Sequence, residues 1–137
     1  MNVAEVKQVL SRCWWLETRI KSERNALMQL RSVASKATPS YSLTSGGGGD
    51  GQKIENCVLR IVELETKNKE TLVALVEAKE AALEIIETLP DARLQSLLRK
   101  RYLSYKKWEE IAVELKCSYR RVHQLHSKAL VFLAKNF

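Results

Sequence analysis

Apolar residues recur every three or four positions in two long segments of the chain, about residues 2–36 and 53–88, and neither segment contains glycine or proline. This spacing predicts two helices, each with one apolar face. In the second segment the steps of three and four continue without a break through Ile54, Cys57, Ile61, Leu64, Asn68, Thr71, Leu75, Ala78, Ala82, Ile85 and Leu89. Such a seam is typical of coiled-coil packing, and its central polar residues, Asn68 and Thr71, can fix the register or the number of partners.

The segment between these helices, ATPSYSLTSGGGGDGQ at residues 37–52, predicts a flexible loop because it holds Pro39, five glycines and little to bury. A loop of this length can reverse the chain, so the pattern predicts a long antiparallel helical hairpin. The second helix also carries an apolar side stripe: Val58, Val62, Leu72, Val76, Leu83 and Ile86. This surface is wider than one partner helix requires. A homodimer with a four-helix arrangement would cover it, whereas an isolated hairpin would leave part of it exposed.

The sequence TLPDA at residues 88–92 predicts the end of the second helix, since proline and aspartate favour the start of a new one. The residues after it contain no further glycine or proline and divide into three helical stretches, about 91–103, 107–115 and 119–135. We therefore expect an all-α fold with two domains. The first, residues 1–89, is a coiled-coil-like hairpin for dimerisation or partner binding, and the second, residues 90–137, is a small helix-turn-helix domain.

The last helical stretch has one apolar and one polar face. Ser118 is a strong N-cap in front of it, and its apolar face comprises Val122, Leu125, Ala129, Phe132 and Leu133. The stretch before it has an apolar face of Trp108, Ile111, Ala112 and Leu115. Only residues 116–118 join the two, and so short a connection forces a sharp crossing, which predicts a helix-turn-helix.

Positive charge is concentrated in the last third of the chain. Residues 1–89 hold 12 Lys and Arg against 12 Asp and Glu, whereas residues 90–137 hold 11 against 4 and account for the whole net charge of +7. A basic segment beside a neutral one indicates that the basic segment binds a polyanion.

The second helix of a helix-turn-helix enters the major groove of double-stranded DNA with its N-terminal part. We expect base contacts from Tyr119, Arg120, Arg121, His123 and Gln124. Arginine can pair with guanine, and glutamine with adenine, through two hydrogen bonds. Contacts to the DNA backbone, which position a protein without reading sequence, are expected from Arg99, Arg101, Lys106, Lys107, Ser127 and Lys128.

Residues 89–133, LPDARLQSLLRKRYLSYKKWEEIAVELKCSYRRVHQLHSKALVFL, resemble region 4 of the sigma-70 family. The shared features are Leu-Pro before a helix, Leu97-Leu98, Arg101-Tyr102, Glu110-Ile111-Ala112, Ser118, Val122, Gln124 and Ala129-Leu130. That region binds the promoter −35 element, so the resemblance implies a DNA-binding transcriptional regulator. The arrangement of long helices, a Gly/Ser loop and a C-terminal sigma-like segment is similar to late-gene regulators of the ArpU/RinA type from phages and prophages.

Three positions depart from the sigma pattern. Lys116 stands where glycine is usual, so we expect a left-handed residue that costs on the order of 1 kcal/mol. Lys106 and Lys107 occupy a position that is usually Ser or Thr, and Arg120 replaces a frequent Glu. We therefore expect a target other than the ordinary −35 sequence. Nothing upstream resembles the sigma region that melts the −10 element, so a complete sigma factor is not expected.

Other classes of function find little support in the sequence. Cys117, His123 and His126 could share a metal ion, but no carboxylate stands beside them on that helix, and we expect neither a metal nor a cofactor. The glycines at 46–49 lie in a polar segment and not in a phosphate-binding loop, so we do not expect an enzyme. The main alternative is an adaptor that binds RNA polymerase, or an anti-sigma-like module, without specific DNA readout.

The sequence also bears on the compartment. The three cysteines, Cys13, Cys57 and Cys117, form no disulfide or zinc pattern. Residues 1–10 lack the charged and apolar regions of a signal peptide, and no apolar run is long enough to span a membrane. We therefore expect a protein of the reducing cytoplasm.

Overall fold

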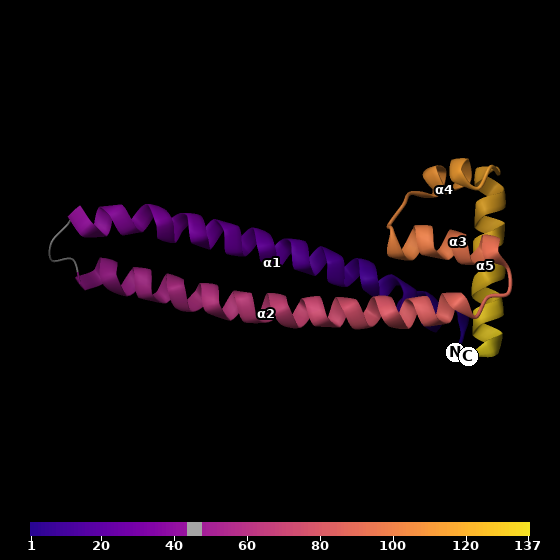
Figure 1. The fold of residues 1–137 in the computed structure, drawn as a ribbon, viewed down its shortest axis with the longest axis horizontal. Coiled ribbons are helices and arrows are strands. Elements are labelled where there is room, and N and C mark those ends of the chain that lie inside the picture. Colours follow the sequence, from indigo (N-terminus) through magenta and orange to yellow (C-terminus); the bar gives the residue numbers. More distant parts are fainter. Residues whose placement is uncertain (44–47) are drawn as a thin grey trace. The chain divides into compact units, whose positions relative to one another are not determined.

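The computed structural model describes the backbone of residues 1–43 and 48–137 and the side chains of residues 1–36 and 51–137. The chain forms the helices α1 (Val3–Leu43), α2 (Gly48–Glu87), α3 (Ala92–Leu98), α4 (Trp108–Glu114) and α5 (Tyr119–Asn136), as Figure 1 shows. One turn of wider π-helix, η1 (Arg99–Leu103), continues α3. No strand occurs in the described residues, which confirms the predicted all-α class.

The two long helices extend beyond their predicted ends. The loop predicted at residues 37–52 is partly helical, since α1 ends at Leu43 and α2 begins at Gly48; the part at residues 44–47 lies outside the described residues. Once a helix exists, each added residue gains one hydrogen bond for one residue fixed, so a packed helix can extend past weak helix formers.

The chain divides into two compact units. The first unit comprises residues 1–17 and 74–137, and the second comprises residues 18–73. The predicted domain boundary at residues 89–90 falls inside the first unit. The first unit therefore combines the start of α1 and the end of α2 with α3, η1, α4 and α5.

In the second unit, α1 and α2 run antiparallel (Figure 1). The Thr71 hydroxyl donates to the Glu23 carboxylate at 3.2 Å, and the guanidinium of Arg31 pairs with Glu65 at 2.7 Å. Between the helices, Ile20, Leu27, Leu64 and Thr71 are buried. Seam positions Leu64 and Thr71 are thus buried as predicted, and Asn68 is half-buried.

The first unit has a larger core. Its buried apolar side chains are Val6, Leu10 and Cys13 of α1; Leu75, Ala78, Ala82, Ile85 and Ile86 of α2; Leu89 after α2; and Leu94, Leu97, Leu98, Tyr102, Ile111, Ala112, Val122, Leu125, Ala129, Leu130 and Leu133 of α3 to α5. Burial raises the pKa of the Cys13 thiol above its usual value. All six helical elements therefore contribute to one core, which holds α5 in place.

Contacts of the Tyr105 side chain fix the segment between η1 and α4. Tyr105 has a φ of 57°, a left-handed conformation that costs a non-glycine residue on the order of 1 kcal/mol. Its hydroxyl donates to the carbonyl oxygen of Cys13 at 3.3 Å and to Glu17 at 3.4 Å, and the Lys79 amine lies 5.9 Å from its ring centre. Burial, and then the charge of Glu17, raise the pKa of Tyr105. The strained turn is therefore anchored to α1 and α2.

Candidate functional site

A short turn joins α4 to α5 and sets the direction of α5. The φ of Lys116 is 54°, which confirms the left-handed conformation expected there. The amide of Lys116 donates to the carbonyl of Val113 at 3.1 Å, and that of Cys117 donates to Ala112 at 3.0 Å. The Arg93 side chain donates to the carbonyl of Leu115 at 2.9 Å. These bonds satisfy carbonyls at the end of α4 and offset the strain of the turn.

Ser118 caps the N-terminus of α5, as predicted. Its φ and ψ are extended, and its hydroxyl accepts a hydrogen bond from the amide of Arg121 at 3.0 Å. The buried side of α5 consists of Val122, Leu125, His126, Ala129, Leu130 and Leu133. The predicted apolar face is confirmed for its main members, while Phe132 is only half-buried.

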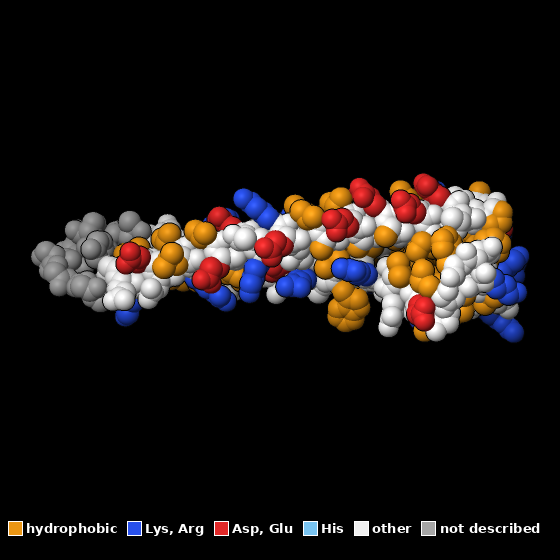
Figure 2. All heavy atoms as spheres, turned by 90° about the horizontal axis from the view of Figure 1, so that it is seen from below, with side chains coloured by type: hydrophobic (Ala, Val, Ile, Leu, Met, Phe, Trp, Pro, Cys, Tyr) orange, Lys and Arg blue, Asp and Glu red, His pale blue; other side chains and the backbone are white. Residues whose placement is uncertain are grey.

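The opposite side of α5 holds the predicted DNA-contacting residues. Tyr119 is 51% exposed, and Arg120, Arg121, Gln124, Ser127 and Lys128 are exposed as well. A shallow hollow on this side is lined by Tyr119, Arg120, His123, Gln124 and Ser127. The guanidinium of Arg121 donates to the side-chain oxygen of Gln124 at 3.4 Å. In Figure 2, Lys and Arg side chains lie at the end of the view where Figure 1 places α5. Hydrogen-bond donors and positive charge therefore project from one helix face.

Both histidines belong to a group of rings in contact that links η1, α4 and α5. The ring centres of Trp108 lie 4.6 Å from His123 and 4.8 Å from His126. Tyr119 lies 4.6 Å from His123, and Tyr102 lies 5.8 Å from His126. These ring contacts join η1, α4 and α5, so they hold the first half of α5 against the rest of the first unit.

His126 is buried and neutral at ordinary pH. Its Nε2 is hydrogen-bonded to the Tyr102 hydroxyl at 2.6 Å. Burial lowers the pKa of His126 to about 4, and the positive charges of Lys7, His123 and Arg101 add to the effect. Burial also raises the pKa of Tyr102 to about 12. His126 lies in the core, where Tyr102 supplies the polar partner that a buried imidazole needs.

His123 is less available than its neighbours on the face. It is half-buried between Trp108 and Tyr119, and its Nε2 is buried without a hydrogen-bond partner in the described part of the chain. A base contact through Nε2 would require the ring to turn. The residues whose polar groups already project into solvent are Arg120, Arg121 and Gln124.

The six predicted backbone-contacting residues fall into two groups. Lys107, Ser127 and Lys128 are exposed. The other three make contacts within the chain. Arg99 pairs with Glu87 at 3.7 Å, the Arg101 guanidinium lies 4.4 Å from the Trp108 ring centre, and Lys106 pairs with Glu114.

Glu114 of α4 holds two lysines. Its carboxylate pairs with Lys106 and, at 2.9 Å, with Lys100. Hydrogen bonds first from Lys106 and then from Lys100 lower the pKa of Glu114 below its usual value. This carboxylate therefore neutralises part of the positive charge on the side of the unit that precedes α5.

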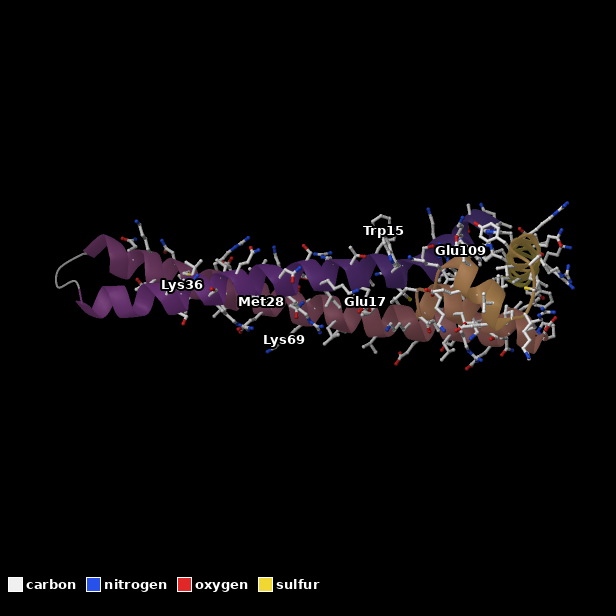
Figure 3. All side chains as sticks on the ribbon, turned by 90° about the horizontal axis from the view of Figure 1, so that it is seen from above. Trp15, Glu17, Met28, Lys36, Lys69 and Glu109 are labelled. Carbon is white, nitrogen blue, oxygen red and sulfur yellow. The ribbon has the colours of Figure 1, made fainter. Side chains whose placement is uncertain are left out.

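A hollow lined by aromatic residues lies on the first unit and was not predicted from the sequence. Its lining consists of Ser11, Trp14, Trp15, Arg101, Tyr102 and Tyr105. Trp15 is 65% exposed and projects away from the ribbon in Figure 3, and Trp14 is 47% exposed. The signal in the sequence was the Trp-Trp pair itself, since two adjacent residues on a helix cannot both face one seam.

Metal sites and membrane-spanning helices are two further classes of feature to consider in the described residues. Nowhere in them do three His, Cys, Asp or Glu side chains gather in a way that would hold a metal ion. None of the helices, over the residues described, combines the length and the apolar character needed to cross a membrane. No family model matches the chain, and no curated protein or solved structure matches it.

Proposed function

We propose that this protein is a sequence-specific regulator of transcription that binds double-stranded DNA with the exposed side of α5 in the major groove. The observation that carries the proposal is the first half of α5. There, Arg120, Arg121 and Gln124 project into solvent from a helix that is capped by Ser118 and packed along its other side. Major-groove readers present their base-contacting side chains from the same part of a recognition helix.

The exposed side chains suit direct readout of bases. Arg120 and Arg121 can each donate two hydrogen bonds to a guanine, and Gln124 can pair with an adenine. A long hydrogen bond, 3.4 Å, joins Arg121 to Gln124, so the two side chains lie next to each other on the exposed side of α5. Tyr119 and His123 supply ring surfaces beside them. Lys107, Ser127 and Lys128 are placed on the surface where they can contact phosphates.

The resemblance to sigma region 4 and to phage and prophage late-gene regulators supports the same role, with the target differing from the −35 element at the base that Arg120 contacts. In this proposal, α4 lies across the DNA backbone and α5 reads the groove. Arg99, Arg101 and Lys106 have a smaller part, because each is held by contacts within the chain.

The experiment is selection of duplexes from random DNA by the full-length chain, followed by affinity measurements on a selected and a scrambled sequence at one salt concentration. A specific reader binds the selected duplex at least about a thousandfold more tightly. Arg120→Ala should abolish most of this preference, whereas the matched control Arg19→Ala, an exposed arginine of the second unit, should leave it unchanged. Failure to enrich any sequence would refute specific readout.

A second function, that of an adaptor for RNA polymerase, is favoured by the hollow around Trp14 and Trp15. Tryptophan, tyrosine and arginine dominate the energetically important positions of protein interfaces, and this hollow contains all three. Binding of purified RNA polymerase to the full chain tests it. If Trp15→Ala weakens binding to the polymerase and Arg120→Ala does not, the chain is an adaptor. If Arg120→Ala weakens binding to DNA and Trp15→Ala does not, the regulator is supported.

A further inference from the structure

The second unit leaves more large apolar side chains exposed than it buries. In its described part, Ile20, Leu27 and Leu64 are buried, whereas seven large apolar residues are exposed: Met28, Val33, Val58, Leu59, Val62, Leu72 and Val73. Monomeric proteins seldom expose large connected apolar surfaces. Five of the seven belong to α2, so this helix has apolar surface that α1 does not cover.

The exposed residues of α2 follow a regular spacing. Leu59, Val62, Thr66, Lys69, Val73 and Val76 are separated by alternating steps of three and four, and all six are exposed. We call these six residues the outer stripe. At 100° per residue they lie roughly 160° around the helix from the buried seam of Leu64, Asn68, Thr71 and Leu75. The outer stripe therefore faces away from α1 and has the pattern of a second coiled-coil seam.

The outer stripe has a symmetry that identifies its partner. Read in either direction, it presents two apolar residues, two polar residues and two apolar residues. Its midpoint lies between residues 67 and 68. A surface that is complementary to itself when reversed is what a two-fold axis requires.

We propose that a second copy of this chain packs on the outer stripe, with the two α2 helices antiparallel and the two-fold axis between residues 67 and 68. In this register Val62 lies opposite the second copy's Val73, and Leu59 lies opposite the second copy's Val76. Thr66 lies opposite the second copy's Lys69. Apolar residues then meet apolar residues at both ends of the contact.

Charge selects the antiparallel arrangement over the parallel one. In a parallel pair, Lys69 would face the second copy's Lys69 in the centre of the seam, and two like charges there are destabilising. In the antiparallel pair, Lys69 meets the second copy's Thr66, which is flanked on the same helix face by Glu63 and Glu70. Figure 3 shows Lys69 projecting from the helix pair, where it can reach such a partner. This contact does not depend on the proposed DNA binding.

The first experiment measures the mass of the full chain by light scattering over a concentration series. The wild type should show the mass of two chains, and Val73→Glu should show the mass of one, with unchanged helical content by circular dichroism. The control Val113→Glu places the same change at a valine of α4 that is 78% exposed, and it should remain a dimer. A monomeric wild type, or a Val73→Glu variant that stays dimeric, would overturn the proposal.

The second experiment tests the register in a background where Cys13, Cys57 and Cys117 are replaced by alanine. A disulfide requires Cα atoms within roughly 7 Å. In the antiparallel pair, Val62→Cys should cross-link with Val73→Cys when the two variants are mixed, and neither should cross-link with itself, because equal positions lie about 16 Å apart along the axis. Self-linking of each variant would show a parallel pair, and the absence of any link would show a different interface; either result contradicts the register.

Discussion

The two units of the chain differ in how many of their apolar side chains are buried. The first unit buries 20 apolar side chains and exposes nine large ones, whereas the described part of the second buries three and exposes seven. The first unit has helical elements that cross and cover one another, so most helices find partners on more than one side. In the second unit each helix has one partner, and one partner covers only a narrow strip of a helix.

This difference underlies the two kinds of partner that we propose. The first unit is complete in its core, and what it exposes on α5 is polar and positively charged, which suits a polyanion. The second unit leaves apolar side chains of α2 exposed, which suits packing against another helix. We therefore propose a DNA-binding face for the first unit and a helix-packing surface on α2.

Replacing one leucine in each unit should have very different effects on the free energy of unfolding. Leu97 is fully buried in the first unit, and Leu59 is 58% exposed in the second. Leu97→Ala should lower the free energy of unfolding by about 2–5 kcal/mol, because it leaves a cavity in a packed core. Leu59→Ala should change the stability of the single chain by no more than about 0.5 kcal/mol. Urea unfolding at a protein concentration low enough to hold the chain monomeric measures both. Equal losses in the free energy of unfolding would show that the two leucines do not differ in burial.

Acid should weaken the first unit through His126. Its pKa is about 4 in the folded chain and about 6.5 when unfolded, so between these values the unfolded chain takes up the proton first. Stability is therefore full above pH 6.5 and falls as the pH drops toward 4, by roughly 3 kcal/mol in total. Free energies of unfolding from pH 7 to pH 4 should show this loss in the wild type.

The variant His126→Gln isolates that contribution, since glutamine does not titrate in this range. Its stability should fall less over the same pH interval than that of the wild type. Parallel pH curves for the two proteins would show that His126 is protonated in the folded chain and would contradict the buried, neutral state.

A single substitution at Arg121 tests the proposed DNA-binding face of α5. Arg121→Ala removes a side chain that can pair with one guanine, so we expect a loss of about 1–3 kcal/mol on the selected DNA and a relaxed preference at one base. Titration of that duplex and of its single-base variants measures both quantities. An equal loss on every sequence would reassign Arg121 to a phosphate contact.

The smallest expected effect concerns Glu114, which binds Lys100 and Lys106. Glu114→Gln removes one negative charge beside the proposed DNA-binding face and frees two lysines. DNA affinity should rise at low salt by no more than about threefold, and the gain should disappear at high salt, because exposed charges are screened. Glu55→Gln, an exposed glutamate of the second unit, serves as the control. A fall in affinity would show that Glu114 positions the lysines for DNA.

Features that depend on neighbouring residues in the sequence were predictable. The five helices follow from apolar spacing, and the cap at Ser118 follows from its hydroxyl. The left-handed Lys116 was expected from the resemblance to the sigma pattern, which usually has glycine there. Helix ends were less predictable, since α1 runs past Pro39 and α2 begins at Gly48, both inside the expected loop.

Features that depend on distant residues were not predictable. His126 bonds to Tyr102, which is 24 positions away, and no periodicity identifies that pair. The same holds for the ring contact between Trp108 and His123 and for the two lysines that pair with Glu114. These contacts lie between helices whose relative rotation is set by the whole core. The polar face of α5 could therefore be predicted from the sequence, but not which of its side chains are held inward.

The central claim is that the chain binds DNA through α5, and the salt dependence of that binding tests it most directly. The dissociation constant of the full chain for the selected duplex should be measured from about 50 to 200 mM salt. If about six phosphates are contacted, a plot of log affinity against log salt has a slope near −5. Arg120→Ala should weaken binding throughout. No binding at the lowest salt concentration, or equal binding by the wild type and Arg120→Ala, would contradict the claim.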